Sequence, residues 1–91
     1  MNYELYTVPK CDGCDDVKNF LNEKGVQYSV YNLREPEHKK YYGKIYSKID
    51  GKLKRNVSDN LALLPLLVEV NENREVKRLA QRLEEITKLF D

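Results

Sequence analysis

The residues of this sequence whose types and spacing suggest chemistry are two cysteines, Cys11 and Cys14, in a C-x-x-C motif. Two intervening residues, Asp12 and Gly13, let the second sulfur reach the first and form a disulfide. A redox cysteine reacts as its thiolate, and the first turn of a helix lowers a thiol pKa. We therefore expect Cys11 to attack a substrate disulfide and Cys14 to resolve the mixed disulfide. Gly13 gives the backbone the freedom to close this ring.

Charged neighbours of the motif act on the thiolate in opposite directions. Lys10 favours it, whereas the carboxylates of Asp12, Asp15 and Asp16 oppose it. This balance favours a reductant over a strong oxidant. An incidental pair of buried cysteines is the plainer alternative to a redox pair.

A zinc site needs more ligands than this chain offers. Tetrahedral zinc takes four ligands, and besides Cys11 and Cys14 the sequence has one histidine, His38. We therefore expect no metal bound by one chain. A site shared between two chains, or completed by external thiols, remains an alternative.

The elements around the motif form an alternating pattern of strands and helices. Pro9 ends the first strand, and the apolar spacing of Cys14, Val17 and Leu21 predicts a helix directly after the motif. The expected strands cover residues 3–8, 26–33, 66–70 and 74–77, although 74–78 could instead open the last helix. The expected helices run from residue 12 or 14 to 24, from Pro36 to the turn at 50–51, and from 79 to 90.

Length and composition limit the function classes. The 91 residues, 41% of them hydrophobic, suit a single domain spanning 1–91. The net charge of +1 argues against a dedicated nucleic-acid binder, and no apolar run approaches the ~20 residues of a membrane span. Without a recognisable secretory signal, we expect a cytoplasmic protein that binds neither nucleic acid nor membrane.

The middle of the chain is distinctly basic. Residues 34–55 contain eight basic and three acidic side chains, +5, whereas the rest carries eight basic and twelve acidic ones, −4. A solvated helix face and loop is the plain interpretation. The alternative is a docking surface for an acidic partner or for glutathione carboxylates. We expect Tyr41, Tyr42 and Tyr46 to form core and rim there.

Two stretches of sequence resemble the glutaredoxin family of the thioredoxin-fold superfamily. They are YELYTV–PKCDGC–DDVKNFLNEKG–VQYSVYNL, over residues 3–33, and LPLLV, over residues 64–68. The resemblance implies an α/β thioredoxin-like fold of glutaredoxin type, βαβ-α-ββα, with a central mixed sheet flanked by helices. It also makes Pro65 a cis-proline that faces the cysteines and turns the Leu64 backbone toward an extended substrate. The glycine pair that commonly follows the family's hairpin and binds glutathione is missing from residues 74–78.

The resemblance implies a thiol–disulfide oxidoreductase that reduces protein or glutathione-mixed disulfides. Substrate contacts would then come from residues around the two cysteines and the proline: Lys10, Asp12, Gly13, Leu64 and Pro65. Glutathione or a flavin-linked reductase would supply electrons to a monomer without a covalently bound cofactor. Two alternatives are a dimeric carrier of a glutathione-assisted iron–sulfur cluster and a redox-inactive interaction module.

Overall fold

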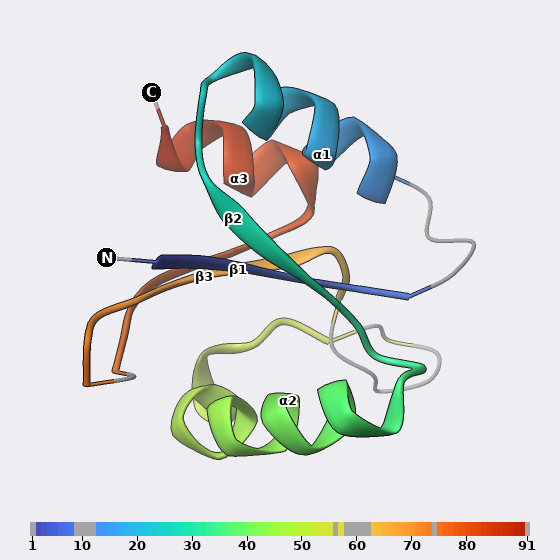
Figure 1. Cartoon of the computed structure of the whole chain (residues 1–91), viewed down its shortest axis with the longest axis vertical. Helices are drawn as coiled ribbons and strands as arrows, with labels where there is room; N and C mark the ends of the chain where they lie inside the picture. The colour runs from blue at the N-terminus through green and yellow to red at the C-terminus, as the bar shows by residue number, and fades with distance from the viewer. Residues whose placement is uncertain (1, 9–12, 56, 58–62, 74, 91) are drawn as a thin grey trace.

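A four-stranded mixed sheet forms the centre of the protein (Figure 1). The computed structural model describes residues 2–8, 13–55, 57, 63–73 and 75–90. The strand order is β2-β1-β3-β4, with β1 parallel to β2 and antiparallel to β3, and β4 antiparallel to β3. The strands are β1 (Asn2–Thr7), β2 (Tyr28–Asn32), β3 (Leu66–Val70) and β4 (Val76–Gln81).

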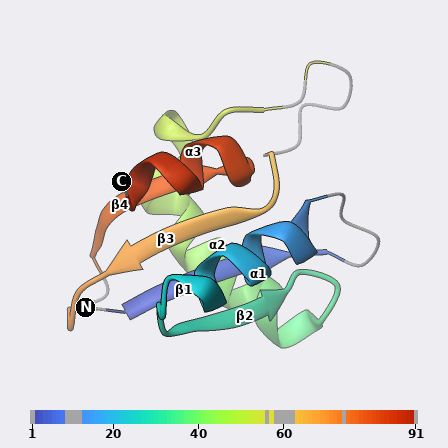
Figure 2. The same ribbon diagram turned by 90° about the horizontal axis from the view of Figure 1, so that it is seen from above.

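Helices cover both faces of this sheet. Helices α1 (Cys14–Glu23) and α3 (Arg82–Leu89) lie together on one face, and α2 (Pro36–Ile49), followed by the short 3₁₀ helix η1 (Asp50–Lys52), lies on the other (Figures 1 and 2). The expected order βαβ-α-ββα is confirmed. Within the described ranges, no helix combines the length and apolar character needed to cross a membrane.

Alternation along the strands produces two separate cores. On the α1 and α3 side, a buried cluster is formed by Leu5, Val17, Leu21, Leu67, Ala80 and Ile86. On the α2 side, a second cluster is formed by Tyr6, Ile45, Ile49, Leu53, Leu66, Val68 and Val70. Because β3 contributes to both clusters, all five of its residues are buried, which explains why it is the most apolar strand.

The tyrosines of α2 pack against the second core, as the sequence predicts. Tyr41, Tyr42 and Tyr46 are partly buried there. The Tyr41 hydroxyl donates a hydrogen bond of 2.5 Å to the Glu4 carboxylate, which is 4% exposed and also accepts one of 3.1 Å from Tyr6. These bonds give a buried carboxylate polar partners inside an apolar layer.

The start of the last helix differs from the sequence prediction. The apolar spacing from Leu79 onward predicted a helix, but β4 extends to Gln81 and α3 begins at Arg82. The reason is tertiary, since Ala80 pairs with Leu67 on β3 and closes the core beneath α1 and α3. The returning strand placed at residues 74–77 therefore lies at Val76–Gln81, and the alternative of a helix starting at residue 74 is wrong.

An ion pair joins β3 to β4 on the α1 and α3 face. Arg78 contacts both carboxylate oxygens of Glu69, Nε to Oε1 at 2.9 Å and Nη2 to Oε2 at 3.3 Å. Nη2 also donates to the Tyr3 hydroxyl at 3.1 Å, and Nη1 donates to the Leu89 carbonyl at 3.4 Å. One guanidinium therefore ties β1, β3 and the end of α3 together. Its hydrogen bond is the main cause of a Glu69 pKa below the usual value.

Candidate active site

The second cysteine of the motif lies at the first position of α1. Cys14 is 4% exposed and disulfide-bonded, so it has no thiol to titrate. Gly13, directly before it, has a φ of 89°, a left-handed conformation that favours glycine. Asp15 and Asp16 occupy the first helical turn, where carboxylates stabilise the positive end of the helix dipole. The expected helix start after the motif is thus confirmed at Cys14.

Three of the predicted site residues, Lys10, Cys11 and Asp12, lie outside the described residues. The role of Cys11 as nucleophile and the roles of Lys10 and Asp12 as substrate contacts therefore stay predictions. The described part of the site consists of the α1 N-terminus, the approach to β3 and the junction between β4 and α3.

The approach to β3 contains the predicted cis-proline. The Leu64–Pro65 peptide bond is cis, as expected. Pro65 is fully buried, and its carbonyl accepts a hydrogen bond of 2.7 Å from the backbone N–H of Arg82. Leu64 is only half buried, and among the described residues no hydrogen bond engages its backbone N–H or C=O. A backbone N–H and C=O of this kind are the groups with which an extended ligand pairs.

A groove beside Cys14 brings these segments together. Its volume is about 480 Å³, and its lining consists of Gly13, Asp16, Pro65, Arg82, Leu83 and Glu84. Two of the predicted substrate contacts, Gly13 and Pro65, therefore share one groove. Its charged lining is mixed, with Asp16 and Glu84 acidic and Arg82 basic. A ligand that carries both an ammonium group and carboxylates suits such a lining.

The sequence prediction missed the residues from the β4–α3 junction. Arg82 has a φ of 68°, a left-handed conformation that L-residues seldom adopt. The comparison of residues 74–78 with the glycine pair that follows the family's hairpin was misplaced, because the strand ends at Gln81. The junction is Gln81-Arg82, so an arginine adopts a conformation typical of glycine. No local pattern in the sequence indicates this conformation.

The basic segment mostly lies away from the groove. Helix α2 packs on the opposite face of the sheet, where Tyr41, Lys44, Ile45, Lys48 and Asn73 line a separate hollow of about 480 Å³. Only the far end of the segment approaches the site, where Lys54 Nζ pairs with Glu85 of α3.

His38 has a structural contact rather than a place near Cys14. It is half buried, and its Nδ1 lies 3.0 Å from the Asn32 nitrogen and 3.1 Å from the Asn32 oxygen. The imidazole ring thus contacts the C-terminal end of the edge strand β2. In the described portion of the chain, no three histidine, cysteine, aspartate or glutamate side chains gather into a metal-binding group.

Comparison with known proteins identifies the family. The family model described as Glutaredoxin matches residues 3–52, which include the C-x-x-C motif and both parallel strands. No curated protein and no solved structure matches the chain. The match covers more than half of the chain, and the mixed sheet with three helices is the arrangement of a thioredoxin-like fold. The chain therefore belongs to the glutaredoxin family, whose members have a thiol oxidoreductase type of role.

Proposed function

We propose that this protein reduces disulfide bonds in proteins and glutathione-mixed disulfides with Cys11 and Cys14 as a dithiol. The Cys11 thiolate attacks one sulfur of the substrate, forms a mixed disulfide and releases the other sulfur as a thiolate. The Cys14 thiolate then attacks the Cys11 sulfur, closes the Cys11–Cys14 disulfide and releases the second substrate thiolate. Two electrons pass from the dithiol to the substrate.

One observation carries the proposal: a disulfide-bonded Cys14 at a helix N-terminus, beside a groove that the cis-proline also lines. The backbone N–H groups of the first turn of α1 stabilise a thiolate there. The backbone of Leu64 can pair with an extended substrate, as an added strand pairs with a sheet edge. The groove then binds the part of the substrate that lies on one side of its disulfide.

The charges of the groove support glutathione as one half of a mixed-disulfide substrate. Glutathione carries one ammonium group and two carboxylates. Arg82 can pair with a carboxylate, while Asp16 and Glu84 can pair with the ammonium group. A second glutathione or a flavin-linked reductase resets the dithiol. In this proposal the protein acts as a monomer in the cytoplasm, where such reductants are available. It needs no covalently bound cofactor.

The test is a coupled reduction assay run with two recycling systems. Wild-type protein is supplied with a protein disulfide or a glutathionylated peptide, and NADPH oxidation is followed with glutathione plus glutathione reductase or with thioredoxin reductase. We expect turnover with at least one system and none after Cys11→Ser. Cys14→Ser should retain reduction of the glutathionylated peptide and lose reduction of the protein disulfide, because the mixed disulfide is not resolved.

Full activity in Cys11→Ser would contradict the dithiol mechanism. A protein that reduces neither substrate, and that is coloured after purification without oxygen, would favour the iron–sulfur cluster carrier instead. A colourless protein inactive in both systems would favour the interaction module.

A further inference from the structure

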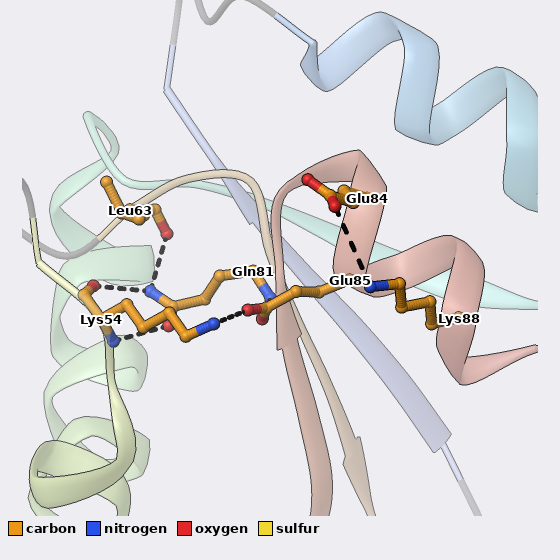
Figure 3. Close-up of polar contacts among 6 residues, drawn as sticks. All are labelled: Lys54, Leu63, Gln81, Glu84, Glu85 and Lys88. Carbon is orange, nitrogen blue, oxygen red and sulfur yellow. Dashed lines mark hydrogen bonds and ion pairs between the residues drawn. The ribbon is translucent and has the colours of Figure 1, made fainter.

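A buried glutamine, Gln81, binds the backbone of both Lys54 and Leu63 beside the active-site groove. Its side chain carries three hydrogen bonds (Figure 3). Oε1 accepts from the Lys54 N–H at 2.7 Å, and Nε2 donates to the carbonyls of Lys54 at 2.9 Å and Leu63 at 3.0 Å. The residue is 2% exposed. The side-chain amide thus makes hydrogen bonds to backbone N–H and C=O groups, as the backbone of a neighbouring strand would.

The two residues that Gln81 holds also contact each other. The Leu63 N–H donates to the Lys54 carbonyl at 3.0 Å. On the α3 side, the Gln81 N–H donates to Glu85 Oε1 at 2.9 Å, and the Lys54 ammonium pairs with the other oxygen of the same carboxylate. The Glu85 pKa is lowered, chiefly by the bond from Lys54. Lys54 is therefore fixed through its backbone by Gln81 and through its side chain by Glu85.

These contacts place Leu64 between two fixed neighbours. The carbonyl of Leu63 is bound by the side chain of Gln81, and the carbonyl of Pro65 is bound by the N–H of Arg82, the next residue along. Gln81 and Arg82, two successive residues at the junction between β4 and α3, thus fix the backbone on both sides of Leu64. Leu64 itself supplies the backbone N–H and C=O that the proposed substrate pairing uses.

A buried amide with all its hydrogen bonds made holds the backbone groups that it binds in one position. Burying an amide without hydrogen-bond partners is unfavourable, so Gln81 is satisfied only when Lys54 and Leu63 are both in place. An apolar side chain of similar size would fill the same volume without fixing the two carbonyls. Burial by itself therefore does not explain why a glutamine stands at this position.

We propose that Gln81 is a positioning residue that holds the Leu64 backbone ready to pair with an extended peptide disulfide. This role rests on the proposed reductase function and makes it more specific. It implies discrimination between substrates, because a peptide pairs with Leu64 and a small disulfide such as hydroxyethyl disulfide has no backbone to pair. Gln81 acts through Leu63 and does not touch the reacting sulfurs.

The test compares Gln81→Met with the wild-type protein on these two substrates in assays without glutathione, because free glutathione would convert hydroxyethyl disulfide into a mixed disulfide that has a peptide backbone. We expect the KM for a disulfide-bonded peptide to rise at least five-fold, while its kcat and both constants for hydroxyethyl disulfide stay within two-fold. Gln81→Glu should raise the peptide KM at least as much at neutral pH, because a carboxylate cannot donate to the two carbonyls. Circular dichroism at the assay temperature verifies that each variant is folded.

A matched control is Glu69→Gln, which weakens the fold at the Arg78 ion pair and leaves the residues around Leu64 unchanged. It should change neither substrate's KM by more than two-fold. Equal losses on both substrates in Gln81→Met, or no loss on either, would overturn the role of Gln81 alone. A wild-type protein that reduces neither substrate would overturn the proposed function and this role with it.

Discussion

Replacing Arg78 by methionine tests the ion pair that joins β3 to β4. The Glu69 side chain is 9% exposed, and Arg78 supplies a donor to each of its carboxylate oxygens. Arg78→Met keeps most of the aliphatic stem that covers the sheet and removes those two donors. The Tyr3 hydroxyl then remains beside a carboxylate that is largely shielded from water.

The magnitude follows from how much water reaches the pair. Breaking a fully buried pair by removing one partner costs about 3–5 kcal/mol, and an exposed pair contributes about 0–1 kcal/mol. The Arg78 side chain is 45% exposed, whereas the Glu69 side chain is 9% exposed. We therefore expect a loss of about 2 kcal/mol in the free energy of unfolding. In a domain of this size, that corresponds to a Tm lower by about 8–16 °C.

Urea and thermal unfolding followed by circular dichroism, with all proteins oxidised, measure this loss. Arg78→Lys should fall between the wild type and Arg78→Met, because an ammonium keeps the charge and loses the two-point geometry. In the double variant Glu69→Gln with Arg78→Met, the loss should be smaller than the sum of the single losses, since no unpaired charge stays buried. A loss below about 0.5 kcal/mol for Arg78→Met, or additive losses in the double variant, would refute this reasoning.

Three further outcomes are expected. Because the pKa values of Glu69 and Glu85 are lowered in the folded protein, their stabilising contribution should be complete above the unfolded value of about 4.3 and decline as the pH falls below it; a urea midpoint independent of pH between 7 and 3 would contradict this. Tyr41→Phe removes the 2.5 Å hydrogen bond to buried Glu4 and should reduce the free energy of unfolding by about 1–2 kcal/mol, measured by urea denaturation. Arg82→Gly should raise thermal stability, because glycine adopts the left-handed backbone without the penalty of about 1 kcal/mol for an L-residue; a lower Tm would show that the arginine side chain contributes more.

Local patterns in the sequence predicted most of the fold and one half of the site. The C-x-x-C motif after a strand placed Cys14 at a helix start, because the apolar spacing of Val17 and Leu21 begins there. Pro65 in an apolar run indicated the approach to a buried strand, and the family resemblance indicated its cis bond. These features depend on near neighbours in the chain.

The other half of the site depends on contacts between distant residues. Leu79 and Ala80 fit a helical spacing as well as a strand, and pairing of Ala80 with Leu67 decided in favour of the strand. That choice sets where Gln81 and Arg82 lie. The amide of Gln81 finds its partners 27 and 18 residues away, at Lys54 and Leu63, and no periodicity of the sequence records such a pairing.

The separation of the two cores by the sheet has an evolutionary consequence. Helix α2 packs on Tyr6, Leu66 and Val68, while α1 and α3, which carry the groove, share the other core. The outward side of α2 can therefore diverge in charge and shape without altering the packing that orients Cys14. Selection for new partners and selection for the redox site act on separate layers of one small protein. The basic side chains of α2, Lys39, Lys40, Lys44 and Lys48, are the kind of local specialisation that this independence permits.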